Sequence, residues 1–297
     1  MDKTTDLIGN SIEMTSMYNV IPDLHADPNR LDTTLARLHG PLAFLGDFID
    51  GKNGQGDDRA VLTRVRGLMD RGAVAVMGNH ELNAILFHHG LREDNTKNRR
   101  QHESFLTAFG HATPEALSWT DWFLTLPLWL DLGGLRLVHA CWRDQDIATI
   151  AARRPDGRLH PDDLPEIHSE SSEFGRAVKR LVSGPEVLLP GGLSFVDGGG
   201  TVRLAVRLAW WRNDMPTWRD AVLSVDDVTL LPDTPLPDDL RAEAYPPDAT
   251  PVLVGHYKMR GLPQVSGVAA SLDYPATACA YRWSGDKTLK QDHLVVI

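Results

Sequence analysis

The chain of 297 residues has two cysteines, Cys141 and Cys279, and no long apolar run. Two cysteines cannot build a disulfide framework, so the composition suits a reducing compartment. No apolar stretch approaches the roughly 20 residues that a membrane-spanning helix needs. Residues 1–17 also lack the apolar core of a secretory signal. These absences predict a cytoplasmic protein with no membrane partner.

Basic residues are also scarce, because 30 Lys and Arg stand against 40 Asp and Glu, which gives a formal net charge of −10. A broad nucleic-acid interface normally needs a basic face, so nucleic acid is not expected as a partner. The charge does not exclude a phosphorylated substrate, because bound cations can invert the local field. The length allows one large hydrophobic core or two modest ones.

The first half of the sequence alternates short apolar runs with segments of helical period. Helices are predicted to begin at Asp27-Pro28-Asn29, at Asp57-Asp58 and directly after Asn79. This alternation of strands and helices predicts an α/β fold with a largely parallel sheet. Four further strands are expected at 252–254, 268–272, 278–283 and 293–297, the last three antiparallel.

Five of the predicted strands end directly in an Asp, Asn or His residue. In open α/β sheets the crevice beyond the carboxyl ends of the strands is where ligands bind. Oxygen and imidazole donors gathered there predict a metal site rather than a packing pattern. These predicted metal ligands are Asp23, His25, Asp47, Asn79, His139 and His256.

The donor set has the composition of a catalytic site with two metal ions. A central carboxylate such as Asp47 can bridge two cations that lie about 3.5–4 Å apart, and such a pair can bind a phosphoryl group and acidify a water. Carboxylate, amide and imidazole donors without thiolate favour Mn²⁺, with Fe or Zn²⁺ as alternatives. Six donors for two ions leave positions open for water and substrate.

His80 follows a predicted ligand at the start of a helix and is therefore predicted to have a different role. A histidine beside such a site, oriented by a carboxylate, can protonate the leaving alkoxide. Asp50, three residues after Asp47, is the predicted orienting partner. Glu81 is interpreted as structural, and His88, His89 and His102 as surface or helix-packing residues.

The motif series resembles that of the calcineurin-like metallophosphoesterases, and more narrowly their phosphoprotein-phosphatase branch. That branch includes Ser/Thr phosphatases and bacterial diadenosine tetraphosphatases. The resemblance covers positions 18 to 275 in the expected order. The matching segments are Asp23-Leu24-His25, Gly46-Asp47-Phe48-Ile49-Asp50, Gly78-Asn79-His80-Glu81, His139 and Gly255-His256.

The resemblance implies a four-layer α/β/β/α sandwich with both metals at the strand ends. It implies Asp23, His25 and Asp47 on the first metal, and Asp47, Asn79, His139 and His256 on the second. His80 and Asp50 would be the acid pair. We expect a single domain over 1–297, with a mostly helical insertion at about 91–134 and a second insertion at about 144–250.

Two features of the motifs bear on the substrate. Nucleases and phosphodiesterases of the superfamily usually carry a second histidine after Gly-His, where this chain has Tyr257-Lys258. Its absence favours a phosphomonoester. The branch also has Arg-Gly after the acidic residue at position 50, where this chain has Gly51-Lys52, and a lysine lacks the planar fork that grips phosphate. The candidate phosphate contacts are Lys52, Arg212, Arg207 and Arg99.

The leading hypothesis is a phosphatase with two metal ions that hydrolyses a phosphomonoester by direct attack of metal-bound hydroxide. The substrate would be a phosphoprotein or a small phosphorylated molecule. A dinucleoside-polyphosphate hydrolase of the diadenosine tetraphosphate type is a first alternative. A metal-binding adaptor without catalysis is a second, although a scaffold has no need of the acid pair His80 and Asp50.

Overall fold

The computed structural model describes residues 17–196, 202–212, 214–223, 225, 227–241 and 243–297. Two β-sheets form its centre. The first has the strand order β14-β13-β1-β2-β3, with β1 (Tyr18–Ile21), β2 (Leu42–Phe44), β3 (Val74–Ala75), β13 (Cys279–Trp283) and β14 (Leu294–Val296). The second has the order β12-β11-β5-β4, with β4 (Trp129–Asp131), β5 (Arg136–Val138), β11 (Val252–Val254) and β12 (Ala269–Ser271).

Both sheets are parallel where they carry the predicted donor residues. β2 pairs in parallel with β1 and β3, and β11 pairs in parallel with β5 and β12. The predicted antiparallel arrangement of the last three strands is correct for β13 and β14. It is wrong for β12, because the long connection after Val254 returns the chain in parallel beside β11, as a crossover connection allows.

The two sheets face each other across one layer of apolar side chains. Val20 and Ala43 of the first sheet share a buried cluster with Leu137 and Leu253 of the second. Ile21, next to Val20, belongs instead to the cluster that contains the helix residues. Successive residues of a strand point to opposite faces, so one face of each sheet meets the other sheet and one meets helices.

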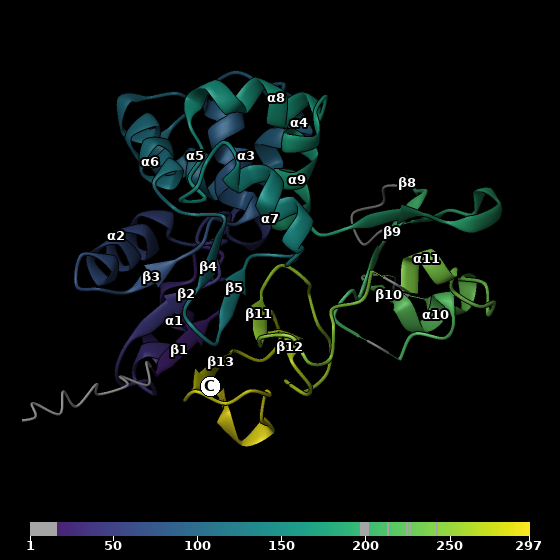
Figure 1. The fold of residues 1–297 in the computed structure, drawn as a ribbon. Coiled ribbons are helices and arrows are strands. Elements are labelled where there is room, and N and C mark those ends of the chain that lie inside the picture. Colours follow the sequence, from purple (N-terminus) through teal and green to yellow (C-terminus); the bar gives the residue numbers. More distant parts are fainter. Residues whose placement is uncertain (1–16, 197–201, 213, 224, 226, 242) are drawn as a thin grey trace, which may run out of the picture.

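Helices cover the outer faces, which completes the predicted α/β/β/α layering. They are α1 (Pro28–Leu35), α2 (Asp58–Met69), α3 (Asn79–His88), α4 (Thr96–Gln101), α5 (Glu103–Phe109), α6 (Pro114–Leu124), α7 (Asp144–Ala151), α8 (Leu164–Ser169) and α9 (Glu173–Ser183). Two short helices, α10 (Trp218–Ala221) and α11 (Asp238–Arg241), pack instead in a peripheral part of the molecule. In Figure 1, α3 to α9 gather at one end of the molecule, above the two sheets. The predicted α/β fold class is confirmed.

The expected insertions differ in character. Residues 91–134 contain α4, α5 and α6, which agrees with a helical segment. Residues 144–250 begin with α7 to α9. They continue into a three-stranded sheet of β6 (Glu186–Leu188), β9 (Ala205–Leu208) and β10 (Val222–Leu223) and a hairpin of β7 (Phe195–Val196) and β8 (Val202–Arg203). This later part has an apolar cluster of its own and lies to one side in Figure 1. The exact bounds of the insertions stay a prediction.

Local chemistry explains where the helices of the first half begin. The Asp27 carboxylate accepts a hydrogen bond from the backbone N–H of Arg30 at 2.9 Å, and Pro28 occupies the first turn of α1. The Asp57 carboxylate accepts from the N–H of Ala60 at 2.9 Å in the same way at α2. Side chains of this type satisfy backbone donors that a helix start leaves free.

A single buried carboxylate connects the ends of β2 and β3. Glu81 is fully buried, and its Oε2 accepts hydrogen bonds from the N–H groups of Asp47 (2.8 Å) and Gly78 (2.9 Å). Its Oε1 accepts from the N–H of Phe48 at 2.8 Å. Glu81 therefore holds the loop after β2 against the start of α3, which agrees with its structural interpretation.

None of the helices in the described part of the chain has the length and apolar character needed to cross a bilayer.

Replacing Glu81 by Gln should destabilise the protein. The amide of Gln offers one acceptor oxygen, and its NH₂ group would face at least one of the three backbone donors. Since a buried unsatisfied donor costs about 1–3 kcal/mol, the free energy of unfolding should fall by about that amount. Urea titrations at pH 8 measure it, above the pKa of about 7 that burial and the Asp47 charge give Glu81. Glu93→Gln, at an exposed position, is the matched control, and equal stability of both variants would contradict the role of Glu81.

Candidate metal centre and acid pair

The six predicted ligands lie together at the carboxyl ends of five strands. β1 is followed by Asp23 and His25, β2 by Asp47, β3 by Asn79, β5 by His139 and β11 by His256. Strands of both sheets therefore contribute donors to one site. Asp23, Asp47, His139 and His256 are buried, and His25 is partly buried.

The backbone turns sharply at this site. His25, Asp47, Asp50 and His256 have positive φ angles of 47°, 50°, 66° and 66°, a region that residues other than glycine rarely adopt. Gly255 permits the close approach of the last of these segments, because a Cβ there would lie 1.9 Å from Oδ1 of Asp23. The turns after the strands therefore aim several donor side chains into one space.

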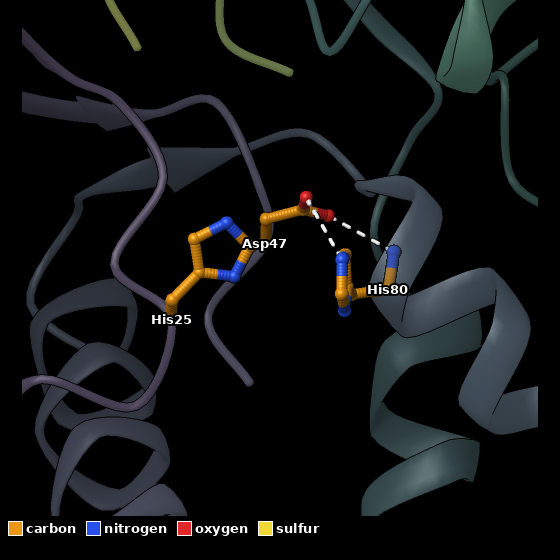
Figure 2. A group of neighbouring side chains, drawn as sticks. All are labelled: His25, Asp47 and His80. Atoms are coloured by element: carbon orange, nitrogen blue, oxygen red, sulfur yellow. Dashed lines mark hydrogen bonds and ion pairs between the residues drawn. The ribbon is translucent and has the colours of Figure 1, made fainter. Parts of the chain in front are cut away.

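The donor atoms form two groups that share one carboxylate. Atoms of His25, Asp47 and His80 lie within 4.8 Å of one another, and so do atoms of Asp47, His139 and His256. Figure 2 shows the first group, with the Asp47 carboxylate between the histidine rings. The structure thus places Asp47 where the sequence predicts a bridging carboxylate, between two potential cation positions.

The surroundings of His139 fit a bound cation. Its Nδ1 donates to the carbonyl oxygen of Leu45 at 2.6 Å, so the neutral ring has a lone pair on Nε2. That nitrogen faces Oδ1 of Asn79 at 3.0 Å and Oδ2 of Asp47 at 3.4 Å. Three acceptor atoms this close repel each other unless a proton or a cation lies between them. Burial lowers the pKa of His139, but the Asp47 charge and hydrogen bond raise it to about 10, so without a cation a proton fills this role.

His256 completes the second group. Its Nδ1 lies 2.7 Å from Oδ1 of Asn79, and its Nε2 is buried without a hydrogen-bond partner among the described residues. Burial, followed by the positive charges of Arg207 and His139, holds the pKa of His256 well below its usual range. A neutral imidazole is the form that ligates metals.

Asp23 is in contact with the site but belongs to neither of the two groups. Its carboxylate accepts from the backbone N–H of His256, with Oδ2 at 2.9 Å. Burial and the negative charges of Asp273 and Asp47 raise the pKa of Asp23 well above its usual value. A nearby cation would remove this penalty, so Asp23 is suited to a metal site and poorly suited to a metal-free core. The predicted ligand sets of the two metals stay a prediction.

His80 and Asp50 form the predicted pair. Nδ1 of His80 lies 2.7 Å from Oδ2 of Asp50, while Nε2 of the same ring lies 3.8 Å from Oδ2 of Asp47. Burial lowers the pKa of His80, but the charge of Asp47 and the hydrogen bond and charge of Asp50 raise it to about 9. The ring is thus held by a carboxylate and, with no cation at Asp47, carries a proton at neutral pH, as a general acid requires.

Asp50 has a second histidine partner that sequence reasoning did not assign. Nδ1 of His102 lies 2.5 Å from Oδ1 of Asp50. His102 is buried between α4 and α5, as expected of a packing residue, but its contact with Asp50 has no local sequence signal. Burial raises the pKa of Asp50, and the two histidines together lower it to about 2.

A cavity of about 650 Å³ opens beside His25, Asp50 and His80. Its basic lining residues are Arg30, Lys52 and Lys258. Lys52 is among the predicted phosphate contacts. Lys258 follows the Gly255-His256-Tyr257 segment, at the position where the superfamily's nucleases carry a second histidine, but no local sequence signal places it in this cavity.

The other predicted phosphate contacts lie elsewhere. Arg212 lines a different cavity with Trp211 and Arg260, and donates to the carbonyl oxygen of Asp220 at 3.3 Å. Arg99, on the exposed helix α4, forms an ion pair with Asp94. Arg207 is close enough to influence His256 and pairs with Glu186 at 3.5 Å.

The family model for calcineurin-like phosphoesterases matches residues 18–267. The chain belongs to this family. It is accordingly a hydrolase, a metal-dependent phosphoesterase, and enzymes of this family generally use two metal ions. A comparison with curated proteins gives no match.

Several solved structures are similar to this chain. A protein serine/threonine phosphatase from Saccharomyces cerevisiae has a TM-score of 0.50 and 13% identity, and the match covers 97% of this chain and 81% of that one. At this identity, the similarity concerns the fold alone. A candidate diadenosine tetraphosphatase has a TM-score of 0.45 and 15% identity, over 96% and 95% of the two chains. A cold-active protein tyrosine phosphatase has a TM-score of 0.46 and 13% identity, over 94% and 80%.

Replacing Asp47 by Asn should remove at least half of the bound metal from this phosphoesterase. Asn keeps the side-chain volume but offers one neutral oxygen, so it cannot bridge two cations through two anionic oxygens. Elemental analysis of the purified protein after equilibration with Mn²⁺ measures the metal content per chain. Asp121→Asn, at an exposed position of α6, should leave it unchanged. Full metal content together with normal activity in Asp47→Asn would exclude Asp47 as the bridge.

Proposed function

We propose that the protein hydrolyses phosphomonoesters with the help of two divalent cations, Mn²⁺ in the first place. The observation that carries this proposal is that Asp47 lies close both to His25 and to His139 and His256, beside the pair His80 and Asp50. Donors that share one carboxylate in this way suit two cations, and the pair of His80 and Asp50 suits proton transfer to a leaving group. A metal-binding adaptor would need the first feature without the second.

In this proposal Asp23, His25 and Asp47 hold the first cation, and Asp47, Asn79, His139 and His256 hold the second. When bound, the cations lower the pKa of a water molecule and neutralise charge on the phosphoryl group. Asn79 supports this arrangement, since its Oδ1 faces both His139 and His256.

The charge of the cavity favours a phosphorylated substrate only when cations are already bound at the site. Its acidic lining residues are Asp23, Asp27, Asp50, Asp57 and Asp273, which outnumber Arg30, Lys52 and Lys258. An unassisted phosphate would meet a negative field there. Two divalent cations held by the predicted ligands would reverse its sign, and a monoester dianion would then gain more than the monoanion of a diester. Lys52 and Lys258 would bind the remaining phosphate oxygens as point charges.

Position 258 supports a monoester in a second way. The second histidine of the nucleases and phosphodiesterases would stand there, and this chain has Lys258, which lines the cavity. Tyr257, between His256 and Lys258, is 1% exposed and its hydroxyl lies 3.1 Å from Nε1 of Trp210, so it is part of the core. A lysine offers a positive charge to the phosphate and no imidazole to a cation.

His80 would act on the leaving group. Its Nδ1 is tied to Asp50, so Nε2 is the atom that can deliver a proton to the departing oxygen. Asp50 keeps the ring oriented and stabilises the imidazolium before transfer. Proton delivery matters most for substrates whose leaving group is a poor one, such as an alkoxide.

Three substrates distinguish the proposed function from its alternatives. With Mn²⁺ present, p-nitrophenyl phosphate should be hydrolysed much faster than bis-p-nitrophenyl phosphate or diadenosine tetraphosphate. Preferred turnover of diadenosine tetraphosphate would instead identify a dinucleoside-polyphosphate hydrolase. No turnover of any of the three would favour the adaptor.

Replacing His80 by Ala should lower kcat by about 100-fold or more while the metal content persists, because the general acid is lost and the ligands are kept. Steady-state kinetics with phenyl phosphate and elemental analysis of the same sample measure the two quantities. His89→Ala, at the exposed end of α3, is the matched control. Loss of metal from His80→Ala would show that this residue is a ligand.

Replacing Lys258 by Met should raise KM for phenyl phosphate by about 5- to 10-fold, since one charge-assisted contact to the phosphate is lost. Arg212→Met provides the comparison, because Arg212 lines a different cavity. The assignment of Lys258 would be wrong if Arg212→Met changed KM by more than Lys258→Met.

A further inference from the structure

Two buried histidines form a chain of hydrogen bonds behind Asp50, on the side away from His80. His102 contacts Oδ1 of Asp50 through Nδ1 at 2.5 Å, and its Nε2 lies 3.0 Å from Nε2 of His88. Nδ1 of His88 in turn accepts from the backbone N–H of Ala112 at 2.9 Å. Asp50, His102 and His88 are 6%, 5% and 4% exposed, so hardly any water competes for these bonds.

The backbone N–H of Ala112 determines the direction of every bond in the chain. A peptide N–H can only donate, so Nδ1 of His88 carries a lone pair and its ring proton must be on Nε2. This proton points at Nε2 of His102, which must therefore accept. The remaining proton of the neutral His102 ring is then on Nδ1, where it donates to Asp50. No other assignment gives each short contact one donor and one acceptor.

Aromatic packing holds the rings of His88 and His102 in the orientation that these hydrogen bonds require. The His102 ring stacks on Phe105, with centroids 4.6 Å apart and an interplanar angle of 16°. The edges of Phe87 meet both histidines, at 5.7 Å for His88 and 5.9 Å for His102. Neither ring can rotate freely to exchange its donor and acceptor nitrogens.

This series of hydrogen bonds leaves one carboxylate oxygen of Asp50 for His80. Its Oδ1 is occupied by His102 and its backbone N–H donates to Oδ1 of Asp58 at 3.0 Å, so Oδ2 is the atom that faces His80. We propose that His88 and His102 are positioning residues. Because the Ala112 N–H can only donate, the two rings present the Nδ1–H of His102 to Oδ1 of Asp50, and this bond holds Asp50 so that Nε2 of His80 points toward the substrate. This inference rests on the proposed function, in which His80 is the general acid.

The tautomers can be observed without any measurement of activity. Long-range ¹H–¹⁵N spectra of the protein labelled at its histidines, and loaded with diamagnetic Zn²⁺, distinguish protonated from unprotonated ring nitrogens. We expect His88 protonated on Nε2 and His102 on Nδ1, with signals assigned by their loss in His88→Gln and His102→Asn. A proton on Nε2 of His102, or a doubly protonated ring at either residue, would overturn the proposal.

The effect on catalysis should depend on the leaving group. His102→Leu should lower kcat for phenyl phosphate by about tenfold, and kcat for p-nitrophenyl phosphate, whose leaving group needs less help from an acid, by less than about threefold. KM should stay within about twofold for both. In His102→Asn the side-chain amide can still donate to Asp50, so most of the activity on phenyl phosphate should return. His89→Leu is the exposed control.

A merely structural role of His102 predicts a different result. It would lower kcat for both substrates by the same factor, and His102→Asn would not return the activity on phenyl phosphate; either finding would overturn the positioning role. If the unaltered protein hydrolyses neither substrate, the proposed function fails. The spectra then still decide whether the hydrogen bonds run in one direction from the Ala112 N–H to the Asp50 carboxylate.

Discussion

The structure of the site depends on one buried carboxylate that three backbone N–H groups share. Glu81 joins the loop after β2 to the first turn of α3, and thereby fixes Asp47 relative to Asn79. Burial favours the neutral form of Glu81, whereas the three donors favour the ionised form. Helix α3 also carries His80, so the same carboxylate sets the position of Asp47 and of His80. In the proposed function, metal binding and proton transfer thus depend on the same buried carboxylate.

The two sheets contribute unequal parts to this arrangement. The first sheet provides Asp23, His25, Asp47 and Asn79, and the second provides His139 and His256. The apolar layer between the sheets, which includes Val20 and Leu253, therefore brings the donors of the first sheet close to those of the second. A packing defect in that layer would change the distance between the donors of the two sheets.

Much of the site could be predicted from the sequence because its signals are local. Each donor directly follows a strand, and parallel strands present their carboxyl ends at the same edge. The pair of His80 and Asp50 followed from the same reasoning. His102 could not be found in this way, since its contact with Asp50 spans 52 positions and depends on how α4 and α5 pack. The parallel pairing of β12 had no local signal either, because a run of small apolar residues fits either sheet. Lys258 differs again. The sequence shows that it lies next to the Gly255-His256 motif, but only the tertiary structure shows that it lines the cavity.

The left-handed backbone at His25, Asp47, Asp50 and His256 limits which substitutions can stabilise the protein without loss of its site. Each such residue costs the folded state about 1–2 kcal/mol relative to an ordinary conformation. Glycine would relieve that cost at any of the four positions, and at each it would delete a side chain on which the chemistry depends. Selection for thermal robustness alone would therefore act against this part of the molecule. Gains in robustness have to come from regions remote from it, such as the helical layer and the peripheral sheet.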